Sequence, residues 1–156
     1  MTSTTPPSFL FVCLGNICRS PLAEAALRGA ADDAGIAMTI DSAGTGDWHV
    51  DAPPDRRAQA VARRHGVDVS KLRARQVEQD DFRRFDHIFA LDRSNLAALR
   101  ASAPSDGTAT LTLLMNVVPG RKGDDVHDPY YGDESGFETT WRDVSAAAEA
   151  LVKAHG

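Results

Sequence analysis

The chain has 156 residues, 42% of them hydrophobic and 25% charged, so it is long enough to bury the core of one domain and too apolar for general disorder. Its net charge of -5 argues against a binder of duplex nucleic acid, and it lacks the run of ~18 apolar residues that a membrane-spanning helix needs. Two cysteines, Cys13 and Cys18, are too few for a disulfide scaffold or a structural zinc site, so we expect a cytoplasmic protein. We further expect a single domain over residues 1–156, with a loose polar lead-in at 1–7.

The N-terminal part of the chain predicts a strand, a loop and a helix. Residues 8–12 are apolar and rich in β-forming side chains, as in a buried strand. After the loop, Ser20 is a favourable N-cap and Pro21 suits the first helical position. Apolar residues at helical spacing follow, and Gly35 is a suitable residue to end the helix.

The middle of the chain continues this alternation. We expect strands at 37–41 and 86–92, helices at 55–64 and 94–100, and a loop at 42–48. The first of these helices has an outer basic face, which we interpret as solvated. Its members are Arg56, Arg57, Arg63 and Arg64.

The C-terminal part predicts one more strand, a long loop and a final helix. The strand spans 109–114, and the polar loop at 116–136 is long enough to suggest a functional role. Ser135 and Glu138 match a capping box at the start of the helix. The helix then carries an apolar stripe at steps of three and four residues, formed by Phe137, Trp141, Val144, Ala148 and Leu151.

Strands that alternate with helices predict an α/β fold with a mainly parallel sheet. Ligands of such sheets bind at the carboxyl ends of the strands, beside the point where the strand order reverses. Cys13 directly follows the first predicted strand. The loop that begins at Cys13 is therefore the candidate site.

The residues of this loop suit the binding of an anion. Gly15 lets the backbone approach a ligand closely, and Asn16 tolerates a positive φ. Backbone N–H groups, the N-terminus of the following helix and the guanidinium of Arg19 would together hold a phosphate-like group. The same surroundings favour the thiolate of Cys13, which makes it a candidate nucleophile.

A nucleophilic cysteine in a phosphate site points to hydrolysis of a phosphate monoester through a phosphocysteine, without a metal. The leaving group then needs an acid, and Asp128, oriented by Pro129, is the candidate. Trp48, Tyr130 and Tyr131 are candidates for the cleft wall, where their rings would stack on an aromatic substrate.

The segment Val12–Pro21 resembles the phosphate-binding loop of the low-molecular-weight protein tyrosine phosphatases. The resemblance covers nearly the whole chain and continues at residues 41–45, 48, 74–76, 85–88, 91–95 and 128–132. It implies a four-stranded parallel sheet with helices on both faces, and the phosphate-binding loop between the first strand and the first helix. It also implies a phosphotyrosine-containing protein as substrate, with a bacterial tyrosine kinase as one example, and no cofactor. We expect a monomer.

The resemblance assigns roles to individual residues. Cys13 is implied as the nucleophile, Arg19 as the group that binds phosphate and the transition state, and Asp128 as the general acid and base. Ser20 is implied to stabilise the thiolate. The loop further comprises Leu14, Gly15, Asn16, Ile17 and Cys18, and its support is assigned to Asn16, Ser42 and Asn95.

Two positions depart from the family pattern. Leu72 stands where relatives often have a histidine that supports the loop, so the support here is weaker or comes from another residue. Asp51 stands where relatives often have glycine, which adds a negative charge near the rim of the cleft.

Other functions stay open on the same fold. A thiol-dependent arsenate reductase needs further cysteines downstream, and none follows Cys18. Related protein arginine phosphatases have threonine where this loop has Ile17, which favours phosphotyrosine. A module that only binds phosphate could lose Cys13 or Asp128, and both are present. Cys18 is either a small side chain packed under the loop or the redox partner of Cys13 in a reversible disulfide.

Overall fold

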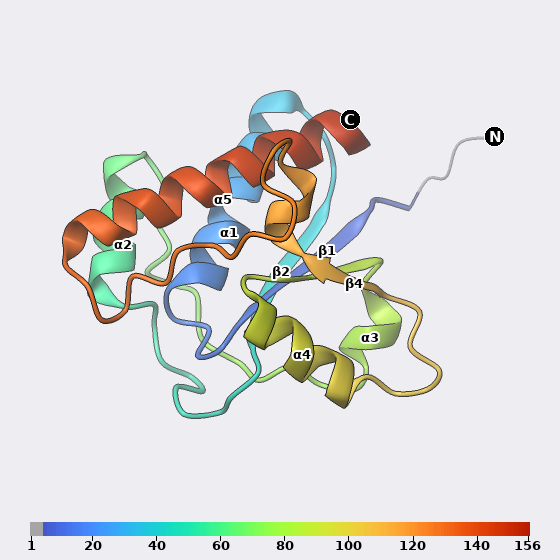
Figure 1. Cartoon of the computed structure of the whole chain (residues 1–156). Helices are drawn as coiled ribbons and strands as arrows, with labels where there is room; N and C mark the ends of the chain where they lie inside the picture. Colours follow the sequence, from blue (N-terminus) through green and yellow to red (C-terminus); the bar gives the residue numbers. More distant parts are fainter. Residues whose placement is uncertain (1–4) are drawn as a thin grey trace.

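The strands form a parallel sheet. In the computed structural model, which describes residues 5–156, four strands lie in the order β2-β1-β3-β4 (Figure 1). They are β1 (Ser8–Cys13), β2 (Thr39–Gly44), β3 (His87–Ala90) and β4 (Thr110–Leu113). The predicted α/β fold is confirmed. Because β2 and β3 lie on opposite sides of β1, the strand order reverses at β1, and Cys13 is its last residue.

The predicted helices are all present. Within residues 5–156 the helical elements are α1 (Arg19–Ala34), α2 (Arg56–Arg64), α3 (Asp81–Arg84), α4 (Arg93–Ser102), α5 (Glu134–His155) and the 3-10 turn η1 (Leu114–Val117). The elements α3 and η1 were not predicted. Each has four residues, which is too short for a helical repeat of apolar positions to be recognised.

Helices cover both faces of the sheet. Alternate residues of β1 point to opposite faces, so Phe9, Phe11 and Cys13 belong to one apolar cluster, while Leu10 and Val12 belong to another. The first cluster is completed by α1, α2 and α5, and the second by α3 and α4 (Figure 1). Cys13 is thus fixed by the same core that fixes the strand.

The strand β2 is shifted from its predicted position: it begins at Thr39 rather than residue 37 and ends at Gly44 rather than residue 41. Its last three residues were expected in a loop, but they pair in register with the end of β1, with Gly44 opposite Cys13. Pairing with a central strand outweighs the modest β-propensity of Ser, Ala and Gly. The extension carries Ser42 to the same edge of the sheet as Cys13.

Two predicted helix caps are wrong. The helix α1 begins at Arg19, so Ser20 lies inside the first turn and its hydroxyl contacts side chains of the loop instead. The N-cap of α5 is Asp133, whose carboxylate accepts the backbone N–H of Ser135. Glu138 pairs with the C-terminal end of α2. Ser20 is thus engaged by the loop before the helix, and Glu138 by a distant helix, so neither side chain serves its predicted cap.

The final helix α5 packs across α1 and α2 (Figure 1). Its predicted apolar stripe is buried, as seen at Phe137, Trp141, Val144, Ala148 and Leu151. No helix within residues 5–156 is long and apolar enough to cross a membrane. Residues 1–4 of the expected loose lead-in lie outside the described residues, and the carbonyl of Pro7 accepts the N–H of Thr39.

Candidate active site

The segment from Cys13 to Arg19, here called the Cys13 loop, turns sharply between β1 and α1. Asn16 has a φ of 57°, in the left-handed region that the sequence analysis expected it to tolerate. The end of β2 approaches this loop closely at Gly44, where an added Cβ atom would lie 2.7 Å from the carbonyl oxygen of Leu14. A residue without a side chain is therefore needed at position 44 for the loop to take this shape.

The sulfur of Cys13 lies in a polar environment at the floor of the loop. The backbone N–H of Asn16 donates to Cys13 Sγ at 3.3 Å, and Ser20 Oγ lies 3.1 Å from the same sulfur. Ser20 Oγ already accepts a hydrogen bond from Asn16 Nδ2 at 2.7 Å. The hydroxyl hydrogen of Ser20 has two acceptors in reach, the sulfur and the carbonyl oxygen of Ala43 at 3.5 Å. Donated to the sulfur, it stabilises a thiolate.

Asn16 also connects the loop to the surrounding chain. Its Nδ2 donates to Ser42 Oγ at 3.0 Å, and its Oδ1 accepts the backbone N–H of Arg75 at 3.0 Å. Ser42 Oγ in turn donates to Glu24 Oε1 at 2.7 Å. Burial raises the pKa of Glu24, against the opposing effect of hydrogen bonds from Ser42 and Arg28.

The network around Asn16 is complete without a histidine at position 72. Leu72 is half-buried and packs against the core cluster that contains Cys13. Glu24 and the backbone of Arg75, which the sequence analysis missed, supply the remaining contacts. Asn95 is buried, and none of its hydrogen bonds among the described residues reaches the loop; its backbone N–H donates to Asp92.

Arg19 is held by two carboxylates. Its Nη1 lies 2.8 Å from Asp92 Oδ2, and its Nη2 lies 3.6 Å from Asp128 Oδ2. Burial opposes the charge of Arg19, but Cys13, Asp92 and Asp128 outweigh it and raise the pKa of the guanidinium. Asp92 follows β3 and was not assigned a role from sequence. Its position at the carboxyl end of the strand next to β1 was the available signal.

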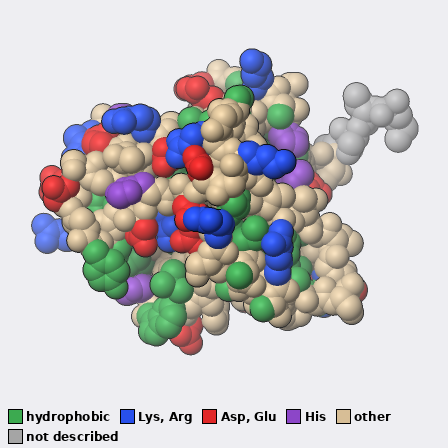
Figure 2. Space-filling view, viewed as in Figure 1, with side chains coloured by type: hydrophobic (Ala, Val, Ile, Leu, Met, Phe, Trp, Pro, Cys, Tyr) green, Lys and Arg blue, Asp and Glu red, His purple; other side chains and the backbone are tan. Residues whose placement is uncertain are grey.

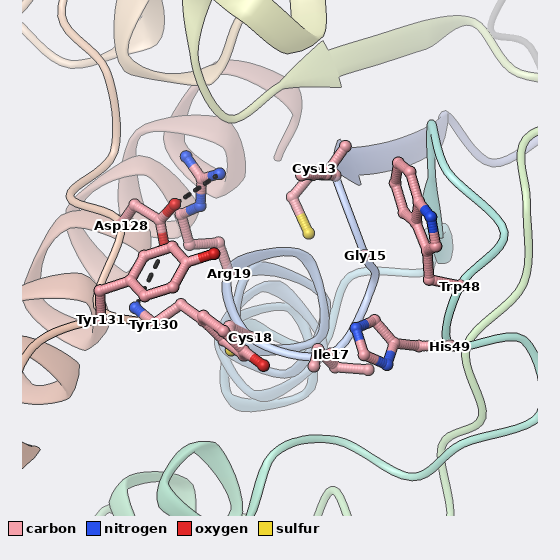
Figure 3. A pocket seen from close by; sticks show the side chains of 11 residues that line it. Cys13, Gly15, Ile17, Cys18, Arg19, Trp48, His49, Asp128, Tyr130 and Tyr131 are labelled. Carbon is pink, nitrogen blue, oxygen red and sulfur yellow. Dashed lines mark hydrogen bonds and ion pairs between the residues drawn. The ribbon is translucent and has the colours of Figure 1, made fainter.

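A pocket of about 180 Å³ opens above the sulfur of Cys13. Figure 3 shows Arg19, Asp128 and Tyr130 on one side of this opening and Trp48 and His49 on the other. The side chain of Arg19 is only 5% exposed, whereas that of Asp128 is 51% exposed. The pocket therefore combines a buried cation and thiol with a carboxyl group that solvent reaches.

The rim of the pocket is apolar and exposed. Four of the exposed large hydrophobic side chains in residues 5–156 line the pocket: Leu14, Trp48, Tyr130 and Tyr131. Figure 2 shows exposed hydrophobic side chains gathered at the lower left of the molecule, toward which β1 runs in Figure 1. All three residues predicted for the cleft wall line the pocket, as does His49.

Two glycine-related features shape this rim. A Cβ atom on Gly46 would overlap the ring of Trp48, so the ring can fold back over the loop only because position 46 has no side chain. Asp51, which departs from the family pattern, is exposed and has a φ of 71°. This left-handed conformation is the physical reason why glycine suits position 51.

Cys18 is buried and also lines the pocket. Neither Cys13 nor Cys18 is in a disulfide. Burial, with a smaller effect of Asp55, raises the pKa of the Cys18 thiol well above its ordinary value. Cys18 is accordingly protonated at neutral pH. A nucleophilic cysteine, by contrast, has a lowered pKa and is present as the thiolate.

One part of the basic face on α2 is not simply solvated. Arg57 donates to the carbonyl oxygens of Tyr130, at 3.0 Å, and Gly132, at 3.2 Å. It also pairs with Asp55, the N-cap of α2. The interpretation of this residue as a solvated cation is corrected, because tertiary folding brings the loop after Asp128 against it.

Comparisons with known proteins agree with this geometry. The family model described as "Low molecular weight phosphotyrosine protein phosphatase" matches residues 8–155. A low molecular weight protein-tyrosine-phosphatase of Streptomyces coelicolor is 45% identical over 149 residues, which cover 92% of this chain and 90% of the relative. The structure of YfkJ from Bacillus subtilis matches with a TM-score of 0.89 and 38% identity, over 98% of this chain and 96% of that chain. A drosophila arginine phosphatase matches with a TM-score of 0.87 and 32% identity, over 94% and 96%.

Proposed function

The chain belongs to the low molecular weight phosphotyrosine protein phosphatase family and is a protein tyrosine phosphatase, and we propose that it hydrolyses phosphotyrosine through a phosphocysteine formed on Cys13. The observation that carries this mechanism is the convergence of three groups on one pocket. They are the sulfur of Cys13, the guanidinium of Arg19 and the carboxyl group of Asp128.

In the first step, the thiolate of Cys13 attacks phosphorus. The S–P bond forms as the P–O bond to tyrosine breaks, and Asp128 gives its proton to the leaving oxygen. Arg19 and the N–H groups of the Cys13 loop stabilise the negative charge on the other phosphate oxygens. The distance of 3.6 Å between Asp128 Oδ2 and Arg19 Nη2 supports this arrangement, because it places the carboxyl group beside the phosphate-binding guanidinium.

In the second step, water attacks the phosphocysteine. Asp128 removes a proton from the water, the P–O bond forms, and the S–P bond breaks to release inorganic phosphate. Ser20, 3.1 Å from Cys13 Sγ, stabilises the departing thiolate. The side chains of the pocket supply a group for every proton and charge in this cycle, so we propose that it runs without a metal or cofactor.

We expect Asp128→Asn to lower kcat/KM far more for poor leaving groups than for good ones. Asparagine cannot supply the proton, and general acid catalysis contributes about 10²–10⁴-fold when the leaving oxygen is basic. The measurement is kcat/KM for a series from p-nitrophenyl phosphate to phenyl phosphate, with EDTA present. An equal loss across the series would remove Asp128 from the acid role. Asp33→Asn, at an exposed aspartate of α1 that does not line the pocket, is the matched control.

We further propose that Cys18 is the redox partner of Cys13. Peroxide would convert the Cys13 thiolate to a sulfenic acid, and the thiol of Cys18 would then displace water to form the disulfide. The burial of both thiols beside the same pocket supports this role. We expect peptide mass mapping after mild peroxide treatment to show a Cys13–Cys18 link. Finding only the sulfinic acid of Cys13 would contradict this redox role. The control is Cys18→Ser, which cannot form the disulfide and should therefore show the sulfinic acid of Cys13.

The substrates, on this proposal, are phosphotyrosine-containing proteins, a bacterial tyrosine kinase among them, and the enzyme works as a monomer in the cytoplasm. A complete pocket within one chain supports the monomer. Two free cysteines fit a reducing compartment.

A further inference from the structure

We propose that Arg57 is a positioning residue for the general acid. It fastens the segment 128–133, here called the acid segment, to the Cys13 loop, and so holds the carboxyl group of Asp128 toward the phosphate site. The inference rests on the acid role proposed above for Asp128. Arg57 itself lies on α2, outside the lining of the pocket.

The chain before the acid segment is anchored to the core. The N–H of Val126 donates to the carbonyl of Leu91 at 2.7 Å, and the hydroxyl of Thr140 donates to the carbonyl of His127 at 2.8 Å. These contacts fix the point at which the chain enters the segment, but they do not determine how it continues.

Within the acid segment, the hydrogen bonds are local. The N–H of Tyr130 donates to Asp128 Oδ1 at 3.1 Å, and the N–H of Gly132 donates to the carbonyl of Pro129 at 3.1 Å. From elsewhere in residues 5–156, the segment receives the ion pair of Arg19 with Asp128 and the two hydrogen bonds of Arg57. Its last residue, Asp133, also accepts the N–H groups that begin α5. Between its two ends, Arg57 is therefore the side chain from another element that holds the backbone of the segment.

Arg57 is itself rigidly held. Its Nε lies 3.0 Å from Asp55 Oδ1 and its Nη2 lies 3.0 Å from Asp55 Oδ2, a two-point pair. The backbone N–H of Asp55 donates at 2.8 Å to the carbonyl of Ile17, in the Cys13 loop. The guanidinium also lies 4.8 Å from the ring centre of the buried Phe137. A continuous set of contacts thus runs from the Cys13 loop through Asp55 and Arg57 to the acid segment.

This connection matters because Asp128 is half-exposed, and the position of its backbone limits where its carboxyl group can reach. Proton transfer requires the carboxyl group within hydrogen-bond reach of the leaving oxygen. A displacement of about 1 Å in a reacting geometry costs about 10²-fold in rate. Loss of Arg57 should therefore weaken acid catalysis while leaving the thiolate and Arg19 in place.

The test compares Arg57→Met with Arg56→Met, a change of the exposed neighbouring arginine on the same helix. For Arg57→Met we expect kcat/KM to fall about tenfold on phenyl phosphate and less than about threefold on p-nitrophenyl phosphate. The inhibition constant of inorganic phosphate should stay within about twofold, and Arg56→Met should match the wild type. Arg57→Lys, which keeps the charge and can reach one carbonyl, should recover part of the loss.

Asp128→Asn, measured in the same series, separates the possible outcomes. If it shows leaving-group dependence and Arg57→Met adds little further loss in the Asp128→Asn background, the two residues act through one function. If Asp128→Asn shows that dependence and the Arg57 variants show an equal loss or no loss across the series, the positioning role is overturned. If Asp128→Asn shows no leaving-group dependence, the proposed acid role of Asp128 is contradicted, and the positioning role of Arg57 is overturned with it.

Discussion

Replacing Cys13 with serine is expected to abolish turnover of p-nitrophenyl phosphate and leave the fold and phosphate binding largely intact. Serine keeps a small polar side chain at the end of β1, where Cys13 is buried and in contact with Asn16 and Ser20. Its hydroxyl is a far weaker nucleophile at neutral pH, and no neighbouring base is positioned to activate it. The measurements are the initial rate with EDTA present, the affinity for inorganic phosphate by calorimetry, and the thermal midpoint.

Cys18→Ser is the matched control, because it changes the other buried thiol of the same loop. We expect it to remain active under reducing conditions. A Cys13→Ser enzyme with activity comparable to that of the wild type would exclude Cys13 as the nucleophile. Loss of activity in both variants, together with a lower thermal midpoint, would mean that the loop tolerates neither change.

Arg19→Lys is expected to lower kcat on p-nitrophenyl phosphate by about 10²–10³-fold, the cost of losing a group that stabilises transition-state charge. Lysine keeps the charge but presents a single compact ammonium, which cannot contact Asp92, Asp128 and two phosphate oxygens as a guanidinium can. The change also leaves the carboxylate of Asp92, 2.8 Å from Arg19 Nη1 in the wild type, with a poorer partner.

The control for Arg19→Lys is Arg83→Lys, a change of an arginine on α3 that forms a surface ion pair with Asp106. That variant should retain wild-type kcat, since exposed ion pairs contribute little to stability. The inhibition constant of inorganic phosphate should rise in Arg19→Lys and stay unchanged in Arg83→Lys. Retention of more than about a tenth of the wild-type kcat by Arg19→Lys would contradict a transition-state role.

The sequence allowed the Cys13 loop to be predicted because its determinants are local. A strand end, a glycine, an asparagine with positive φ and an arginine lie within seven residues, and each acts through its own backbone or side chain. The alternation of strands and helices likewise led to the parallel sheet, because the hydrophobic repeat of each element is set by neighbours in the chain.

The residues that sequence reasoning missed act across long separations in the chain. Asp92 reaches Arg19 only because β3 lies next to β1, and Glu24 reaches Ser42 only because β2 extends to Gly44. Arg57 resembled a solvated cation because α2 is amphipathic, and nothing local indicates that the acid segment packs against it. The wrong caps at Ser20 and Ser135 have a local origin instead: Ser20 contacts Cys13 and Asn16 of the loop, and Asp133 competes with Ser135 for the cap of α5.

The contrast between the buried floor of the pocket and its exposed rim has a consequence for inhibitor design. The floor is formed by Cys13, Arg19 and backbone N–H groups. On the proposed function, these groups would bind any tetrahedral anion of the right size. An inhibitor group that mimics such an anion gains affinity from the floor, but it gains little selectivity among enzymes that share this loop. Selectivity has to come from the part of the compound that leaves the floor and lies between Trp48 and Tyr131, which are 70% and 94% exposed.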